Sequence, residues 1–156
     1  MLRRLALFLA LSLPVQADEL APVLVNYWTN NGSLPPEYAW ETSILIREDG
    51  QLELKHCKGY ETEGPACKLR RAKVPEAALD AIRTAARESG LVARPARETD
   101  TPIVGGGLAW GRVTLAEGTV DLPSQPRDAD VERVGKVLAA IAAAIPPRFN
   151  RFTDPD

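Results

Sequence analysis

Aromatic and cationic side chains on predicted strands are the residues of this chain best suited to bind another molecule. Trp110, Arg112 and Thr114 alternate along one strand, so their side chains point to the same face of a sheet. Tryptophan and arginine are enriched at the energetic centres of binding surfaces. Arg47 lies on the outer face of another predicted hairpin, and Trp40 flanks a loop that contains a pair of prolines. These residues are the candidate binding residues.

The aromatic residues have a structural alternative. The C-terminal tail or the long connection at residues 91–107 could cover Trp110 and make it part of a second small core. Trp28, Tyr38 and Trp40 flank the loop N-G-S-L-P-P, where they could contact a ligand or pack the edge of the sheet. The sequence leaves both alternatives open.

Sequence motifs for catalysis are missing from the chain. His56 is the single histidine, and no G-x-S-x-G, S-x-x-K, H-E-x-x-H or phosphate-binding loop occurs. Strand alternation puts His56 on the core side of its strand, opposite Thr42, which favours a packed and hydrogen-bonded histidine. A hydrolase that uses a pair of its scattered carboxylates is a weaker alternative, because such a pair needs no local motif. We expect a protein that is not an enzyme, with no catalytic residue, metal or cofactor.

The charge and hydropathy of the chain exclude two classes of partner. The 19 Lys and Arg residues stand against 21 Asp and Glu, and a formal net charge of −2 gives no electrostatic basis for binding nucleic acid. The basic cluster K-L-R-R-A-K at residues 68–73 is expected to be a solvated face. No apolar run reaches the ~20 residues that a membrane-spanning helix needs, so we expect no membrane span in the mature chain.

Residues 1–17 have the pattern of a secretory signal peptide. Arg3 and Arg4 precede an apolar run at 5–13, and small residues at positions 15 and 17 mark a cleavage site after Ala17. An acidic pair follows at once, and no cysteine that could carry a lipid follows the cleavage site. The mature protein is therefore expected to be periplasmic or secreted.

Cys57 and Cys67 are the two cysteines of the chain. An oxidising compartment favours a disulfide between them, which would close a short loop. A redox or metal role is the alternative, but the pair lacks the C-x-x-C spacing, and two cysteines with one histidine make a poor zinc site. We predict a structural disulfide.

Two hairpins follow from the alternation of apolar residues. In the first, strands at 42–47 and 51–57 are joined by a three-residue loop that ends at Gly50, because this loop pairs Ile46 with Leu52 on the apolar face. Gly50 then takes a left-handed backbone conformation. The outer face of this hairpin carries Leu45, Arg47, Glu53 and Lys55.

The second hairpin joins strands at 109–115 and 119–122. A two-residue turn at 117–118 is expected to pair Leu115 with Val120, and in the same register Val113 faces Leu122. Its opposite face then carries the candidate binding residues Trp110, Arg112 and Thr114.

Two amphipathic helices complete the elements. The first is expected at 75–89, with proline at its first position and Gly90 after its end. The second begins near Asp128 or Asp130, either of which is a good N-cap, and Pro146 ends it. Their apolar stripes are Leu79, Ile82 and Ala86 in the first, and Val131, Val134, Leu138, Ile141 and Ile145 in the second.

With a further strand at 23–29, the element order is β-β-β-α-β-β-α. This order predicts an α+β fold in which an antiparallel sheet of about five strands carries two helices packed on one face. Residues 18–147 form the single domain, and a tail follows at 148–156, whose Phe149 and Phe152 can pack back on it.

The chain also resembles a known family in its layout. The segments G-S-L-P-P-E-Y, S-I-L-I-R-E-D-G-Q-L-E-L and V-P-E-A-A-L-D-A-I, followed by a hairpin and a helix, are similar in order to the emfourin-type proteinaceous inhibitors of metallopeptidases. The resemblance covers about residues 44–145 and implies a small α/β domain that inhibits an enzyme. The signal peptide, the disulfide and the additional N-terminal strand depart from that layout, so no inhibitory residue is carried over.

These features together predict a periplasmic or secreted, non-catalytic protein-binding module. Its expected partner is another protein, an enzyme such as a hydrolase, which the module would inhibit or for which it would act as an immunity-like partner. A small-molecule or glycan-binding domain that uses the uncovered face of the sheet is the alternative.

Overall fold

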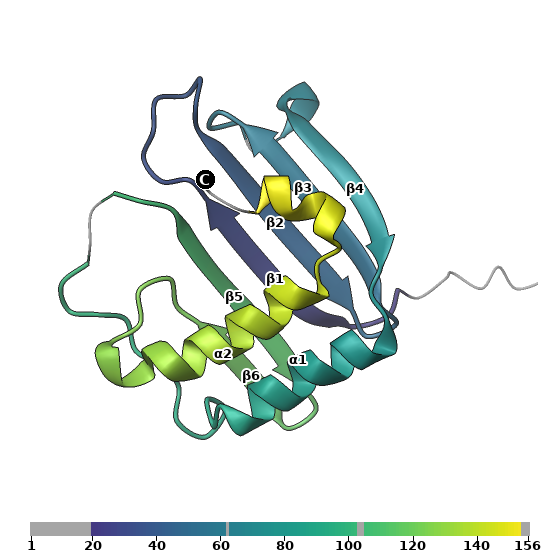
Figure 1. The fold of residues 1–156 in the computed structure, drawn as a ribbon, viewed down its shortest axis with the longest axis vertical. Helices are drawn as coiled ribbons and strands as arrows, with labels where there is room; N and C mark the ends of the chain where they lie inside the picture. Colours follow the sequence, from purple (N-terminus) through teal and green to yellow (C-terminus); the bar gives the residue numbers. More distant parts are fainter. Residues whose placement is uncertain (1–19, 62, 103–104, 154–156) are drawn as a thin grey trace, which may run out of the picture.

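A six-stranded antiparallel sheet forms the framework of the molecule (Figure 1). The computed structural model describes residues 20–61, 63–102 and 105–153. The predicted signal peptide, residues 1–17, lies outside the described residues. The strands are β1 (Val23–Asn30), β2 (Trp40–Arg47), β3 (Gln51–Lys58), β4 (Cys67–Lys73), β5 (Leu108–Leu115) and β6 (Gly118–Leu122), and their order in the sheet is β4-β3-β2-β1-β5-β6.

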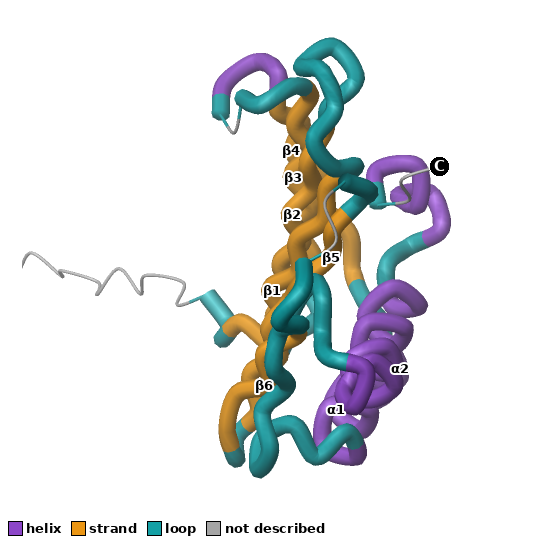
Figure 2. The backbone as a smooth tube through the Cα atoms, turned by 90° about the vertical axis from the view of Figure 1, so that its left-hand side faces the viewer, coloured by secondary structure: helices purple, strands orange, loops and turns teal. Residues whose placement is uncertain are grey.

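Both helices lie on the same face of this sheet. They are α1 (Glu76–Glu88) and α2 (Asp128–Ala144), and the short 3-10 helix η2 (Pro147–Phe152) covers the same face beyond the end of α2 (Figures 1 and 2). A second 3-10 helix, η1 (Gly64–Ala66), lies in the β3–β4 connection. Phe149 and Phe152 of η2 are buried against the core. The predicted α+β fold with two helices on one face is confirmed.

The sheet has one strand more than the element order predicted. Strand β4 consists of residues that were expected to form a solvated basic face. Its sequence does not alternate between apolar and polar residues, because β4 lies at the edge of the sheet, where Lys68, Arg71 and Lys73 are exposed to solvent. The true element order is therefore β-β-β-β-α-β-β-α.

The first hairpin has the predicted register. Ile46 pairs with Leu52 and Ile44 with Leu54, and all these side chains are buried. Gly50 has a φ of 82°, as the three-residue loop requires. A Cβ atom at Gly50 would lie 2.5 Å from the carbonyl oxygen of Val74, so the backbone approaches this glycine too closely for any side chain.

The predicted register of the second hairpin is wrong by two residues. Leu115 pairs with Gly118 and Val113 with Val120. The physical reason is a contact with Val92, which lies in the long connection after α1. A Cβ atom at Gly118 would lie 2.9 Å from the Val92 side chain, so the residue opposite Leu115 must be a glycine. A shift of two residues keeps every side chain on its predicted face.

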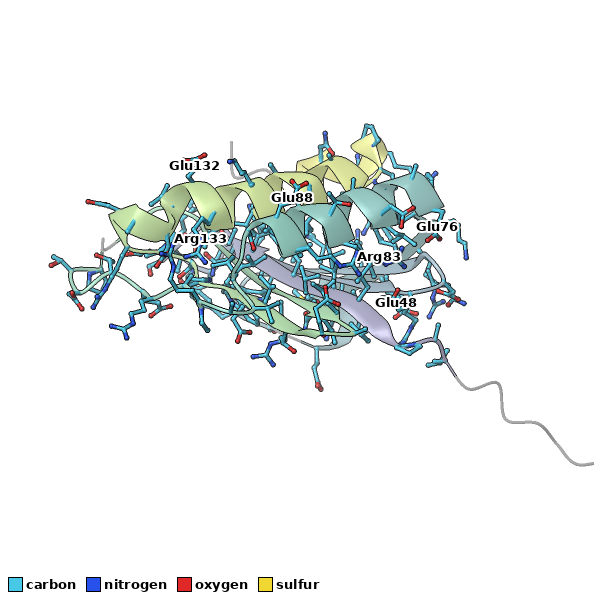
Figure 3. All side chains as sticks on the ribbon, turned by 90° about the horizontal axis from the view of Figure 1, so that it is seen from below. Glu48, Glu76, Arg83, Glu88, Glu132 and Arg133 are labelled. Atoms are coloured by element: carbon cyan, nitrogen blue, oxygen red, sulfur yellow. A yellow bond between two sulfur atoms is a disulfide. The ribbon has the colours of Figure 1, made fainter. Side chains whose placement is uncertain are left out.

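Helix α1 buries the predicted stripe Leu79, Ile82 and Ala86, although Pro75 is its N-cap and not its first residue. Arg83 holds this helix over the β2–β3 turn through an ion pair with Glu48 at 2.5 Å, and it also forms an ion pair with Glu76 of the same helix at 2.8 Å (Figure 3). Apolar packing of its buried face and the Arg83–Glu48 ion pair therefore hold the helix on the sheet.

The predicted stripe of α2 is wrong at its first member. Val131 is 51% exposed, and the buried positions are Asp130, Val134, Val137, Ile141 and Ala144. Asp130 turns inward because its carboxylate accepts a hydrogen bond from the backbone N–H of Arg97 and forms an ion pair with Arg133 at 2.6 Å. The N-cap is Arg127, so neither predicted aspartate caps the helix.

Replacement of Gly50 by alanine tests the close approach in the first hairpin. We expect Gly50→Ala to lower the free energy of unfolding by about 1–3 kcal/mol, because it combines a positive φ with a backbone clash. Gly135→Ala is the matched control: it lies within α2 with open space around it, and we expect it to raise the free energy of unfolding by up to about 1 kcal/mol. Equal effects of the two substitutions in urea unfolding would contradict this account.

Candidate functional site

The face of the sheet opposite α1, α2 and η2 carries no described helix (Figure 2). We call it the open face. Cross-strand pairing arranges its side chains in rows that run across the strands. One row consists of Leu69, Lys55, Ser43, Trp28 and Trp110, and the next of Arg71, Glu53, Leu45, Asn26, Arg112 and Asp121.

A pair of tryptophans forms the aromatic centre of the open face. Trp28 of β1 lies directly opposite Trp110 of β5, with ring centroids 5.9 Å apart. Trp110 is 40% exposed, and Trp28 is half-buried. The described part of the tail does not cover Trp110, because η2 lies on the opposite side of the sheet (Figure 2) and its Phe149 and Phe152 belong to the core. The pair presents an aromatic surface to solvent.

A cleft of about 380 Å³ lies beside Trp110. The long connection forms one wall of this cleft with Ala96 and Glu98, so the connection borders the tryptophan and does not bury it. Arg112 and Asp121 form the other wall and are joined by an ion pair of 2.6 Å. Both side chains of this pair are more than half exposed, so they remain available to a partner.

A second and smaller depression lies on the β4 side of the tryptophan pair. Its volume is about 200 Å³, and it mixes apolar with polar side chains. Its lining residues are Asn26, Ser43, Ile44, Leu45, Glu53, Lys55 and Leu69.

The structure brings three of the five candidate residues together. Trp110, Arg112 and Thr114 all lie on the open face of β5. Arg47 lies on the same face at the far end of β2, where its guanidinium donates a hydrogen bond of 2.9 Å to the carbonyl oxygen of Ala21. Arg47 therefore fixes the start of β1 and is not part of the aromatic centre.

Trp40 lies on the other face of the sheet, so it does not share a site with Trp110. It follows the same alternation as Thr42 and Ile44, which point toward the helices, and its ring centroid is 5.7 Å from that of His56. Trp40 was grouped with the candidate residues because it flanks a loop, and strand alternation decides its face instead.

Trp28 is the residue of the aromatic centre that the candidate set lacked. The buried residues Val25 and Tyr27 put Trp28 on the outer face by alternation, so its direction was available from the sequence. Its position opposite Trp110 was not available, because it depends on β1 lying between β2 and β5.

His56 has the packed position that alternation predicts. It pairs with Thr42 across the strands, and its Nδ1 lies 2.8 Å from the Thr42 hydroxyl oxygen. The Thr42 hydroxyl donates its hydrogen to the carbonyl oxygen of Phe152, so His56 Nδ1 must be the donor in their mutual bond. Burial, reinforced by the positive charge of Arg70 and of two nearby lysines, lowers the pKa of His56. The histidine thus orients the Thr42 hydroxyl, which binds η2 to the sheet.

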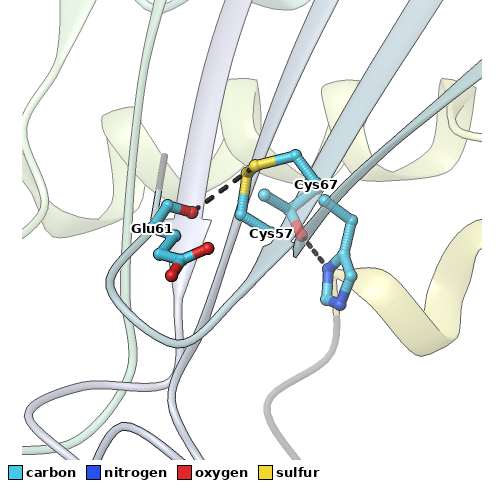
Figure 4. Close-up of a disulfide and its surroundings, with 5 residues drawn as sticks. Cys57, Glu61 and Cys67 are labelled. Carbon is cyan, nitrogen blue, oxygen red and sulfur yellow. Dashed lines mark hydrogen bonds between the residues drawn. A yellow bond between two sulfur atoms is a disulfide. The ribbon is translucent and has the colours of Figure 1, made fainter. Parts of the chain in front are cut away.

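Cys57 and Cys67 form the predicted disulfide (Figure 4). They lie directly opposite each other on β3 and β4, so the bond joins the edge strand to its neighbour. The carbonyl oxygen of Glu61, in the connection between these strands, lies 3.4 Å from the sulfur of Cys67.

Within the described part of the chain, no group of three or more His, Cys, Asp or Glu residues is arranged to hold a metal ion. None of the helices in the same residues is long and apolar enough to cross a membrane. The open face thus carries a partly exposed pair of aromatic side chains with an exposed ion pair, Arg112–Asp121, close to it.

No protein-family model matches the chain, and no curated protein matches its sequence. The layout shared with emfourin-type inhibitors therefore stays a prediction.

The lowered pKa of His56 predicts a loss of stability in mild acid. The unfolded chain binds a proton at this histidine as the pH falls through about 6.5, whereas the folded protein resists protonation. The free energy of unfolding is therefore at its full value above this pH and decreases below it. We expect chemical unfolding between pH 7.5 and 5 to show this decrease.

His56→Asn is the control for this pH dependence, because its amide can still donate to Thr42 but does not titrate. We expect the variant to have a flat stability profile over the same range. Asp49 and Asp130, whose pKa values are lowered by hydrogen bonds to backbone N–H groups, affect stability only in stronger acid. An unchanged slope in His56→Asn would show that another group causes the decrease.

Proposed function

We propose that this protein is a non-catalytic binding module that recognises another protein through its open face. The observation that carries this proposal is the Trp28–Trp110 pair, which is partly exposed on a sheet face that no described helix covers. Large aromatic side chains left accessible on a folded surface lose a contact with water when a partner covers them. Arg112 supplies a charged group beside them that can orient that partner.

The dimensions of the open face favour a protein over a small ligand. Six strands, four of them eight residues long, give a face of at most roughly 24 Å by 27 Å, or about 650 Å². A standard protein–protein interface covers about 800 Å² on each partner, which is of the same order. The depressions on the face are shallow and lie on either side of the tryptophan pair, so a broad partner would contact both.

We place the module outside the cytoplasm, periplasmic or secreted, and take an enzyme as its partner, which it would inhibit or neutralise. The N-terminal export pattern and the Cys57–Cys67 disulfide support the compartment. The layout similar to that of emfourin-type inhibitors supports the role. A hydrolase is the class of enzyme that this layout suggests.

Truncation of Trp110 is the direct test of the site. With the oxidised mature chain as bait against periplasmic and secreted extracts, we expect one hydrolase to be captured by the wild type and lost with Trp110→Ala. With that enzyme purified, we expect the affinity to fall at least ~30-fold, as for an aromatic residue at an interface centre.

Tyr38→Ala is the matched control, because Tyr38 is 68% exposed and lies in the β1–β2 loop outside the rows of the open face. We expect this variant to bind like the wild type, and both variants to keep circular dichroism spectra of a folded protein. Full binding by Trp110→Ala, or equal losses in the two variants, would remove the open face from the proposal.

A glycan or small molecule bound in the cleft beside Trp110 is the second candidate. The about 380 Å³ of this cleft, next to an indole ring and an Arg112–Asp121 pair, are the features that favour it. A ligand of this kind would raise the melting temperature of the isolated protein, by an amount set by its concentration relative to its Kd. A protein partner would be needed for any such stabilisation under the first candidate.

A further inference from the structure

Strand β4 is one of the two edges of the sheet. Its neighbour on one side is β3, and no described strand pairs with its other side (Figure 1). Half of the backbone N–H and C=O groups of an edge strand point away from the sheet and can pair with another chain. Leu69, in the middle of β4, is 52% exposed, so an apolar contact accompanies these free backbone groups.

The charge of this edge is strongly positive, although the whole chain is slightly acidic. Residues 67–73 contain four cations and no acid. Arg71 forms an ion pair of 3.1 Å with Glu53 and is still 70% exposed. Among the described residues, no carboxylate forms an ion pair with Lys68 or Arg70, and the Nη1 atom of Arg70 is buried without a hydrogen-bond partner. The guanidinium of Arg70 lies instead over the ring of Phe152, 4.0 Å from its centroid.

We propose that β4 is a docking site for an acidic, extended segment of another protein, which adds to the sheet as a seventh strand. Addition of a strand to an open edge supplies main-chain hydrogen bonds, and alternate side chains supply the specificity. This inference concerns the edge strand and not the Trp28–Trp110 pair, although Leu69 also lines the smaller depression of the open face, and it does not depend on the function proposed above.

Charge selects the occupant. A second copy of the chain would bring two β4 strands together and oppose their cations, and like charges opposite each other destabilise a strand pair. An acidic segment avoids this repulsion and forms opposite-charge pairs on both of its faces. Lys68 and Arg70 point to the helix side of the sheet, and Leu69 and Arg71 to the open face. A segment that fits has acidic residues on both of its faces and an apolar residue opposite Leu69.

A basic edge also protects a sheet from aggregation without any partner. The two roles differ in one respect, because a protective edge needs only charge, whereas a docking edge also uses its backbone groups. Binding that depends on both charge and backbone hydrogen bonds therefore separates them.

The probe for this test is a fluorescein-labelled peptide with blocked ends, Thr-Glu-Val-Glu-Glu-Val-Glu-Thr. Its matched control has proline in place of both valines, which keeps the charge but removes two backbone donors. We expect fluorescence anisotropy at low salt to show binding of the first peptide and at least ~10-fold weaker binding of the second. We also expect amide hydrogen exchange within 67–73 to slow when the first peptide is bound.

The protein variants test the location. Lys68→Glu combined with Arg71→Gln removes most of the positive charge of β4, and we expect it to weaken binding of the first peptide at least ~10-fold. Arg94→Glu combined with Arg97→Gln makes the same change in net charge at two exposed arginines of the long connection, and we expect it to bind like the wild type. We expect the Trp110→Ala protein to bind the first peptide like the wild type. A negative result with the peptide therefore contradicts the β4 proposal and leaves the open-face proposal untouched.

Three results would overturn the inference. One is that the first peptide does not bind to the wild-type protein. Another is that both peptides bind equally, which would mean that charge alone acts. The third is that both pairs of substitutions weaken binding to the same extent, with the melting temperatures confirming that both proteins are folded.

Discussion

Helices α1 and α2 and the turn η2 all pack against one face of the sheet, because that face carries the apolar side chains of every central strand. Leu24, Ile44 and Leu54 are fully buried beneath them. Since α1, α2 and η2 all lie on this side, the tryptophans, ion pairs and depressions of the opposite face are exposed to solvent. The position of the candidate site thus follows from one-sided coverage of the sheet.

The end of the covered face depends on a chain of contacts between distant parts of the sequence. Phe152 of η2 accepts a hydrogen bond from Thr42 through its backbone, and its ring contacts the ring of His56 and the guanidinium of Arg70. These contacts hold the C-terminal segment away from the open face. They also place Arg70 of the edge strand against an aromatic ring, which orders the positive edge.

Much of the fold was available from the sequence, because it depends on local patterns. Alternation gave the register of the first hairpin and the inward direction of His56, and helical spacing gave the buried residues of α1. The predictions failed where a distant residue decides the outcome. Val92 selects the register at Gly118, and Arg97 and Arg133 draw Asp130 inward in place of Val131. Strand β4 was missed because an edge strand need not alternate.

The candidate site could be predicted only in part for the same reason. The shared face of Trp110, Arg112 and Thr114 follows from alternation along one strand. The pairing of Trp110 with Trp28 depends on the order of the strands in the sheet. The separation of Trp40 from them depends on the face of the sheet toward which the first residue of β2 points. These are properties of the whole sheet.

Site-specific photocrosslinking tests the central claim, that the open face is the binding surface, most directly. A benzophenone side chain would be introduced in place of Thr114 on the open face and, separately, in place of Lys136 on the exposed side of α2. The two oxidised proteins would be irradiated in periplasmic and secreted extracts and the products identified by mass spectrometry. This account predicts one crosslinked enzyme from position 114 and none from position 136. Crosslinking of that enzyme from position 136 alone, or no crosslinked protein from position 114, would contradict it.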